Sequence, residues 1–531
     1  MTTIKTYNTP IYNYLRKYAK QNINIFHVPG HKLAKGIPHE LAQDILQLDV
    51  TEIEGTDNLH YPEGIIKEAE ELAAKAFGAD KTFFLVNGST CGIQAAIMST
   101  CTRGQKIIIG RDSHKSVVAG LILSGAEPVF AYPEYNCEFG ITEAITVKSI
   151  EKSLVQHPDA VAVLITRPNY YGICSDIGEI SSLVHSYNKL LIVDEAHGAH
   201  LAINQKLPPS ALKHGADICI QSAHKTLPAL TQGAYLHVKG NRVDIDRLKF
   251  NLSMLQTSSP SYIIMSYLDI ARELMERDGA EKLDQLIDEI QWFKKELEKY
   301  PEYKVLSCKN LICDSVTLPF SDKKQIPPSV SLANPEAIIT HDPTRLVINI
   351  SKLGISGYYA EKLLRESFKT QVEMADYENL VFITTTADNH ETFSALLEAM
   401  KGLLKILDNN EKPRNLGMHS DIIKRYYTEL HNSVDLIKTG KSTNGEKAVL
   451  SNKNTGILPY EAYIACTEKI PVEESCNRIC ADVITPYPPG IPILYPGEII
   501  KNNHIQYITA IINVGGTING IKHNKYVKVV K

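Results

Sequence analysis

One lysine of the sequence follows directly after a short apolar run, where it could act as a covalent catalyst. The run Asp217–Ile220 leads into Gln221-Ser222-Ala223-His224-Lys225-Thr226. In water a lysine amine is protonated and unreactive, but at a strand end beside a cationic or apolar wall its pKa falls and it can condense with an aldehyde. Lys225 is therefore a candidate for a Schiff base, although most lysines of a chain are solvated surface residues.

A carboxylate ends a second apolar run. Leu191-Ile192-Val193 leads into Asp194-Glu195-Ala196-His197. An aspartate at this point can pair with a protonated pyridine nitrogen and so help the ring to withdraw electrons from a substrate carbon. An aspartate that caps the next turn would look the same in the sequence, so both interpretations stay open.

A third segment has the composition of an anion-binding turn. Phe83–Val86 runs into Asn87-Gly88-Ser89-Thr90-Cys91-Gly92, after which the sequence becomes helical. Hydroxyl groups and the free N–H groups at a helix start converge on an anion such as phosphate. The segment matches neither GxGxxG nor GxxxxGK[ST], which disfavours nucleotide binding. An ordinary helix N-cap is the alternative.

A histidine follows a fourth run, Lys106–Ile109, in the segment Arg111-Asp112-Ser113-His114. An imidazole at this position can stack on a flat heteroaromatic ring. A single histidine is more often a surface residue or a hydrogen-bonded core residue, so this assignment depends on the others.

The runs that precede these residues form one pattern. From about residue 80 to residue 240, short apolar runs alternate with helix-like stretches, which predicts βα units around a parallel sheet buried on both faces. The runs are Thr82–Val86, Lys106–Ile109, Ala160–Thr166, Leu190–Val193, Ile218–Ile220 and Ala234–Val238. Ligands of such sheets bind beyond the carboxyl ends of the strands, so the residues after the runs are expected to share one site.

The remainder of the chain predicts further units. Apolar residues three and four apart over Glu281–Tyr300 predict an amphipathic helix that leaves the sheet domain. Strand-like runs at Leu346–Ile350 and Leu380–Thr384 and a helix over Glu391–Leu407 predict a smaller α/β domain, and polar Asp408–Arg414 predicts a linker. We therefore expect an N-terminal arm over 1–60, a large cofactor-binding domain over 61–300, a small α/β domain over 301–407 and a C-terminal domain over 408–531.

The composition excludes several classes of protein. The chain has 531 residues, of which 44% are hydrophobic and 22% charged, and its net charge is −4. These values are typical of a globular protein of several domains, and without a dense block of Lys and Arg we expect no nucleic-acid or membrane partner. The N-terminus lacks the apolar core of a secretory signal, which predicts a cytoplasmic protein.

Together the motifs resemble the Orn/Lys/Arg decarboxylase family, whose members have fold type I of the pyridoxal-phosphate (PLP) enzymes. Ser-x-His-Lys after one strand, Asp-x-Ala-His after another and Gly-Ser-Thr at a helix start carry the resemblance. It extends over nearly the whole chain through His27–Lys32, Thr51–Ile53, Asp57–His60, Asp342–Leu346 and Pro486–Pro492.

The resemblance implies an aspartate-aminotransferase-like large domain with a mostly parallel sheet, a small α/β domain and an additional C-terminal domain. The sequence lacks the long N-terminal receiver-like domain of the large inducible members and so resembles the shorter, biosynthetic type. One departure lies near the C-terminus, where Asn477 stands in place of an expected glycine. Asparagine tolerates left-handed backbone geometry, so we expect the turn to survive.

The resemblance also assigns roles to residues of this sequence. Lys225 would hold PLP as a Schiff base, Asp194 would pair with the pyridine nitrogen, and His114 would stack on the cofactor face. Ala196 or His197 would lie against or beside the ring. The residues that would hold the phosphate are Ser89, Thr90, Ser222 and His224.

A further segment implies an assembly. Leu255–Pro260, which contains Thr257 and Ser258, resembles a family segment that reaches the cofactor of the neighbouring subunit. The resemblance therefore implies a homodimer or a dimer of dimers.

The resemblance implies the decarboxylation of a basic amino acid. Arginine, which would give agmatine and CO₂ in polyamine biosynthesis, is the first candidate for the substrate, and lysine and ornithine stay open. A tight clamp on the α-carboxylate is not expected, because that charge disperses in the transition state. Arg345 and Arg365 are the arginines concerned, and we expect structural or solvated roles for them. A cationic substrate tail needs carboxylates, for which the candidates are Glu52, Glu54, Asp57, Glu373, Asp376 and Asp482.

Other functions stay open at this stage. A PLP aminotransferase or aldolase would share the fold, and so would a non-catalytic PLP-binding homologue. A metal hydrolase is suggested by the pairs His27/His31 and His197/His200. Pro29 and Gly30 prevent the helical spacing of HExxH, and its glutamate is absent, so we expect no metal.

Overall fold

The largest sheet among the described residues has seven strands in the order β2-β11-β10-β9-β7-β3-β4. The computed structural model describes residues 10–21, 23–43, 45–311, 339–409, 422, 426, 456–487, 490–523 and 525–531. The strands are β2 (Lys81–Leu85), β3 (Lys106–Gly110), β4 (Glu127–Ala131), β7 (Ala162–Thr166), β9 (Leu190–Asp194), β10 (Ile218–Gln221) and β11 (Ala234–Val238).

Helices cover both faces of this sheet. Because successive strand residues point to opposite faces, Ile107 and Ile109 of β3 pack into one hydrophobic cluster and Ile108 into the other. One face is covered by α4 (Gly88–Thr100), α5 (Lys115–Ser124) and α9 (Ile245–Leu255). The other is covered by α3 (Ile65–Phe77), α6 (Val147–Gln156), α7 (Ile177–Ser186) and α10 (Tyr262–Leu297).

A smaller four-stranded sheet follows, in the order β12-β14-β17-β16. Its strands, β12 (Lys304–Val305), β14 (Arg345–Asn349), β16 (Met374–Ala375) and β17 (Asn379–Ile383), pair antiparallel. Helices α11 (Gly357–Phe368) and α12 (His390–Asn409) pack beside it. The N-terminal strand β1 (Asn24–Ile25) pairs with β15 (Thr370–Gln371), so the expected N-terminal arm is bound to this part of the molecule.

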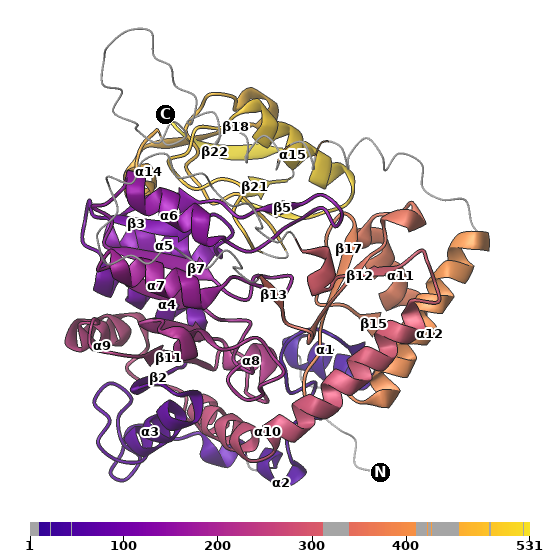
Figure 1. The fold of residues 1–531 in the computed structure, drawn as a ribbon, viewed down its shortest axis with the longest axis horizontal. Helices are drawn as coiled ribbons and strands as arrows, with labels where there is room; N and C mark the ends of the chain where they lie inside the picture. The colour runs from indigo at the N-terminus through magenta and orange to yellow at the C-terminus, as the bar shows by residue number, and fades with distance from the viewer. Residues whose placement is uncertain are drawn as a thin grey trace.

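The C-terminal segment forms a unit with its own hydrophobic cluster, drawn in yellow in Figure 1. It contains a three-stranded sheet of β18 (Thr467–Pro471), β22 (Tyr526–Val530) and β21 (Ile521–Lys522), together with helices α14 (Pro459–Ile464) and α15 (Asn502–Asn513). Asn477 has φ +65°, as expected for an asparagine in place of a glycine.

Short elements complete the described part of the chain. They are helices α1 (Pro10–Ala19), α2 (His39–Ala42) and α8 (Ala223–Thr226), strands β5 (Tyr135–Asn136), β6 (Ile141–Thr142), β8 (Ile173–Cys174), β13 (Thr340–His341), β19 (Thr485–Pro486) and β20 (Ile518–Asn519), and the 3₁₀ helices Ile45–Leu48, Ala211–His214, Cys308–Asn310, Ser351–Leu353 and Val472–Glu474. Within these described ranges no helix is both long and apolar enough to span a membrane.

The predicted runs all form strands, with three differences. Strand β4 was not predicted, and it pairs parallel with β3 at the edge of the sheet. Strand β11 runs antiparallel to both of its neighbours, β10 and β2, within an otherwise parallel sheet. Helix α10 begins at Tyr262 rather than near Glu281, after Ser261, whose side chain accepts a hydrogen bond from the Ile264 N–H.

The predicted linker lies mostly outside the described residues, since its residues 410–414 are not among them.

Candidate active site

Lys225 lies just beyond the carboxyl end of β10, in the short helix α8, and is half-buried. Its Nζ atom lies 3.1 Å from Nε2 of His197, which follows β9. Desolvation lowers the pKa of Lys225, although the negative charges of Asp194 and Glu373 act in the opposite direction. The environment therefore favours the neutral, nucleophilic form of the amine.

Asp194 ends the neighbouring strand β9 and is only 2% exposed. Its Oδ1 accepts a hydrogen bond of 3.1 Å from the Ala196 N–H, so the turn-capping contact considered in the sequence does form. Burial raises the pKa of Asp194 to about 6, while the charge of Lys225 lowers it. The carboxylate and the amine thus belong to one electrostatically coupled site.

A candidate anion-binding site lies at the start of α4. Ser89 in its first turn accepts a hydrogen bond of 2.7 Å from the hydroxyl of Ser222, which joins the ends of β2 and β10. Gly88 has φ +72°, and a Cβ atom there would have no neighbour within 4 Å, so its backbone faces open space. Thr90 is exposed in the same turn. The free N–H groups of the helix start and these hydroxyls suit a phosphate.

Two further predicted histidines face the same region and are both uncharged near neutral pH. Burial lowers the pKa of His224 to about 4, and its Nδ1 lies 3.0 Å from the Gly233 carbonyl oxygen. Burial, assisted by the charge of Lys225, lowers the pKa of His114 to about 3. Nδ1 of His114 accepts a hydrogen bond of 3.2 Å from the Ser116 N–H and so caps α5.

The C-terminal unit reaches His114 directly. A Cβ atom on Gly490, which has φ +90°, would lie 3.3 Å from Cδ2 of His114, and the Lys115 N–H donates to the Gly490 carbonyl oxygen over 3.3 Å. Close by, the Arg111 guanidinium donates to the carbonyl oxygens of Pro492 and Ile493 over 2.6 and 2.8 Å. Gly490, Pro492 and Ile493 of the C-terminal unit are therefore held beside Lys115 and Arg111.

These residues fit PLP by the chemistry of their donor and acceptor groups. A neutral amine suits the aldehyde of PLP, a buried carboxylate suits its pyridine nitrogen, and the turn before α4 suits its phosphate. Buried hydroxyl groups nearby, Oγ of Ser113 and Oγ1 of Thr226, have no hydrogen-bond partner among the described residues. Buried polar groups are rarely left in that state, which is consistent with a site for a polar ligand.

The structure brings together most, but not all, of the predicted residues. Ala196 and His197 are buried directly after Asp194, as the motif requires. Thr257 and Ser258 are exposed after α9, where the Thr257 carbonyl oxygen lies 2.9 Å from Nε2 of His60. Their assignment to a neighbouring subunit's site stays a prediction.

Three contributors were missed or undervalued by sequence reasoning. Tyr170 follows β7, and its ring packs edge-on against His197 with centroids 4.8 Å apart. Arg345, for which a structural or solvated role is expected, is 2% exposed, and its Nη2 lies 2.8 Å from Nδ1 of His197. Glu195 is completely buried and accepts hydrogen bonds of 2.8 Å from Ser210 and Gln221. Tyr170 could have been found from its position after a predicted strand.

The candidate metal ligands are engaged with other groups. His200 lies 3.0 Å from Asp342 and 2.9 Å from Thr344, while His197 contacts Arg345 and Lys225. His27 lies 2.9 Å from the Tyr18 hydroxyl.

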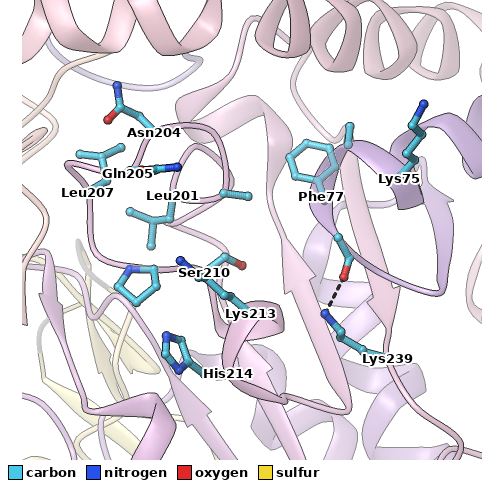
Figure 2. A pocket seen from close by; sticks show the side chains of 14 residues that line it. Lys75, Phe77, Leu201, Asn204, Gln205, Leu207, Ser210, Lys213, His214 and Lys239 are labelled. Carbon is cyan, nitrogen blue, oxygen red and sulfur yellow. Dashed lines mark hydrogen bonds between the residues drawn. The ribbon is translucent and has the colours of Figure 1, made fainter.

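A separate cavity of about 460 Å³ lies at the amino ends of β2 and β10, opposite the strand ends that carry the site (Figure 2). Residues that precede β2 and β10 line it, including Phe77 and His214, together with Lys239 after β11, whose Nζ donates to the Gly78 carbonyl oxygen over 2.9 Å. None of the predicted site residues belongs to its lining, so it is not the site described above.

The sequence matches two family models. The model described as "Orn/Lys/Arg decarboxylase, major domain" matches residues 9–392, and the model described as "Orn/Lys/Arg decarboxylase, C-terminal domain" matches residues 446–525.

Curated relatives agree with these matches. The chain is 34% identical to an arginine decarboxylase of Bacillus anthracis over 98% of this chain and 96% of the relative, and 34% identical to one of Bacillus subtilis over 97% and 96%. The biodegradative arginine decarboxylase of Escherichia coli is 24% identical over 97% of this chain but only 79% of its own length.

Solved structures show the same fold. The lysine decarboxylase of Francisella novicida superposes with a TM-score of 0.71 at 21% identity, covering 98% of this chain and 81% of that one. An alanine–glyoxylate aminotransferase from Nostoc superposes with a TM-score of 0.51 at 14% identity, over 68% of this chain and 92% of that one. The expected fold, with a type I large domain, a small domain and an additional C-terminal domain, is confirmed.

Proposed function

The chain belongs to the Orn/Lys/Arg decarboxylase family, and from that premise we propose that it converts a basic amino acid, in first place arginine, to its amine and CO₂ with PLP as cofactor. The observation that carries the proposal is the position of Lys225 and Asp194 at the carboxyl ends of the neighbouring strands β10 and β9. A desolvated amine and a buried carboxylate at adjacent strand ends are what a PLP enzyme needs at the two ends of the cofactor.

The residues of this chain would divide the work as follows. Lys225 would attach the cofactor through its amine, and Asp194 would hold the proton on the pyridine nitrogen. Ser89 and Ser222 would bind the phosphate, and His114 would cover one face of the ring. When bound, PLP supplies a ring that accepts the electron pair left behind as the bond between Cα and the carboxylate breaks.

Glu373 is our candidate for the carboxylate that receives the cationic tail of the substrate. Its Oε1 accepts from the Tyr170 hydroxyl over 2.8 Å and its Oε2 from the Val28 N–H over 3.0 Å, yet it forms no ion pair with a described residue. Its charge acts on Lys225 and Arg345, so it lies within electrostatic range of the site.

Two other candidates for binding the substrate's tail, Asp57 and Asp376, form hydrogen bonds with neighbouring residues of the chain. Asp57 accepts hydrogen bonds from the N–H groups of Glu63, Gly64 and Ile66 at the start of α3. Asp376 accepts from the side chain of Asn379 over 3.0 Å. Both carboxylates therefore stabilise local structure.

We predict that Glu373→Gln lowers kcat/KM for arginine about tenfold or more, because a hydrogen bond to a charged group is lost while the shape of the side chain is kept. Glu366→Gln, on the exposed face of α11, is the matched control and should leave kcat/KM unchanged. An equal loss in both variants would rule out this role of Glu373.

The most direct test of the proposed function is a product panel. The PLP-loaded protein is incubated separately with arginine, lysine and ornithine, and the amine and the CO₂ are measured. We expect agmatine and CO₂ in equal amounts from arginine, and none with Lys225→Ala. Transfer of the amino group to an added keto acid, without CO₂, would contradict the proposal in favour of an aminotransferase.

The assembly is a further part of the proposal. We propose a homodimer in which Thr257 and Ser258, which are exposed in the single chain, approach the site of the partner. Sedimentation equilibrium should give twice the mass of the chain or a multiple of that, and a monomer at micromolar concentration would contradict it. The domain bounds and the cytoplasmic location expected from the sequence stay predictions.

A further inference from the structure

Three basic side chains form a hydrogen-bonded line that ends at the candidate reacting amine. Nη2 of Arg345 lies 2.8 Å from Nδ1 of His197, and Nε2 of the same imidazole lies 3.1 Å from Nζ of Lys225. Arg345 begins β14 of the small sheet, whereas His197 follows β9 of the large sheet. These hydrogen bonds therefore connect the small sheet, through His197 of the large domain, to the amine of Lys225.

The chemistry of the groups decides where the proton on His197 lies. A guanidinium has N–H groups and no lone pair to offer, so it can only donate to Nδ1. A neutral imidazole that accepts at Nδ1 carries its hydrogen on Nε2. His197 is held neutral because burial lowers its pKa well below the usual value, with the charges of Lys225 and Arg345 acting in the same direction.

We propose that Arg345 is a positioning residue that acts through His197. By donating to Nδ1 it fixes the tautomer with hydrogen on Nε2, so that an N–H group, rather than a lone pair, faces Lys225. The amine then accepts this hydrogen bond with its own lone pair and remains neutral. The assignment of the tautomer is independent of the proposed function, and only its consequence for cofactor capture rests on that function.

The surroundings allow Arg345 and His197 little freedom. A Cβ atom on Gly172 would lie 2.6 Å from Cβ of Arg345, so only a glycine permits the arginine to lie this close. The Tyr170 ring packs on His197 in a T-shaped arrangement, and the centroid of the Tyr170 ring lies 6.0 Å from Cζ of Arg345. The pair is therefore held in one geometry.

A second contact holds the two motifs together beside this pair. Nε2 of His200 lies 3.0 Å from Oδ2 of Asp342, and Thr344 donates to the same carboxylate through its N–H over 3.0 Å. The Asp-x-Ala-His-x-x-His segment and the Asp-Pro-Thr-Arg segment are thus joined twice, by His197 with Arg345 and by His200 with Asp342.

The rival role for Arg345 is to bind the carboxylate of the substrate directly. Its Nη1 is buried without a hydrogen-bond partner among the described residues, so that role has a group available to it. The two roles differ in one respect: a positioning arginine loses its effect when His197 is removed, whereas a substrate-binding arginine does not.

The first test measures the tautomer itself. The full-length protein is labelled with ¹⁵N in its histidines, and the ring nitrogens are observed at pH 7 with and without PLP. The signals of His197 are identified by their loss in His197→Gln. We expect Nδ1 to be unprotonated and Nε2 protonated in both forms. Protonation at Nδ1, or at both nitrogens, would overturn the proposal.

The second test is a double-mutant cycle on the capture of PLP by Lys225, followed by absorbance across pH. We expect Arg345→Met to slow capture at pH 7 about tenfold, the effect of losing one hydrogen bond to a charged group, and to move the pH dependence upward. Arg345→Lys keeps a donor and should restore most of the rate. In a His197→Phe background, Arg345→Met should have no further effect.

Arg365→Met, at an exposed position of α11, is the matched control and should leave the rate unchanged. An equal effect of Arg345→Met with and without His197 would contradict the proposal in favour of direct substrate or cofactor binding. If Arg345→Met does not fold, the ¹⁵N spectrum of the unmodified protein and the capture rate of Arg345→Lys still test the proposal. A correct tautomer in a protein without decarboxylase activity would refute the proposed function and leave this inference standing.

Discussion

At the scale of single residues, the site depends on the shifted pKa values of its buried acidic and basic side chains. Burial raises the pKa of Asp194 to about 6 and lowers that of His114 to about 3. Only an ionised aspartate can hold a proton on a pyridine nitrogen, and only a neutral imidazole can lie against that ring without adding a second positive charge. Both conditions are met near neutral pH.

The pKa of Asp194 leads to a prediction for cofactor affinity. We expect the affinity for PLP to be constant above pH 7 and to fall below pH 6, as Asp194 takes up a proton. Asp194→Asn should weaken binding at pH 8 by at least about 2 kcal/mol, because one partner of a buried charge pair is removed. Equilibrium dialysis between pH 5 and 8 measures both effects.

A smaller pH step should remain in Asp194→Asn, because a phosphate ester itself titrates with a pKa of about 6. The difference between the two proteins is therefore the quantity that tests the role of Asp194. Asp159→Asn, at an exposed position, serves as the control and should behave as the unmodified protein. Identical pH curves for all three proteins would refute the pairing.

At the scale of elements, turns rather than regular structure place the site. Gly490 has φ +90° and lies against His114. Gly515 has the same φ, but a Cβ atom there would have no neighbour within 4 Å. Both alanine variants would carry the same backbone strain of about 1–2 kcal/mol. Only the new Cβ of Gly490→Ala would meet the imidazole, at 3.3 Å.

We predict that Gly490→Ala lowers the affinity for PLP severalfold, because His114 must shift, whereas Gly515→Ala lowers only the thermal unfolding temperature. Dialysis and calorimetry on both variants separate the two effects. A loss of PLP affinity in Gly515→Ala that equals the loss in Gly490→Ala would mean that strain alone, and not the contact with His114, is responsible.

The elements also show how far sequence reasoning extends. The apolar runs predicted six strands of the large sheet, because a strand buried on both faces must be continuously apolar. Helix α10 was predicted only in its second half, although its start is marked by Pro260 and the capping residue Ser261. The contact between His197 and Arg345 could not be predicted, because nothing in the spacing of the two motifs states that they meet in space.

At the scale of the whole molecule, a buried arginine, Arg111, links the C-terminal unit to the large domain. Arg111 forms a salt bridge of 3.1 Å with Glu498, with both side chains 8% exposed, and its guanidinium lies 4.5 Å from the centre of the Tyr495 ring. A buried pair of this kind is costly to break, because the remaining charge has no partner.

We predict that Glu498→Gln destabilises the protein by about 3–5 kcal/mol, since it leaves the Arg111 charge buried without its counter-ion. Lys206→Met breaks the exposed pair with Asp284, in which the side chains are 58% and 43% exposed, and should cost at most about 1 kcal/mol. Urea unfolding of both variants measures the difference. Equal midpoints would show that Arg111 does not fix the C-terminal unit.

The central claim is that Lys225 is the residue that binds PLP covalently. It is tested most directly by reduction of the PLP-loaded protein with borohydride, followed by digestion and mass spectrometry of the peptides. The account predicts one modified peptide, with the reduced cofactor on Lys225, and loss of the visible absorbance band. Label on another lysine, or an unmodified Lys225 after the band has gone, would contradict it.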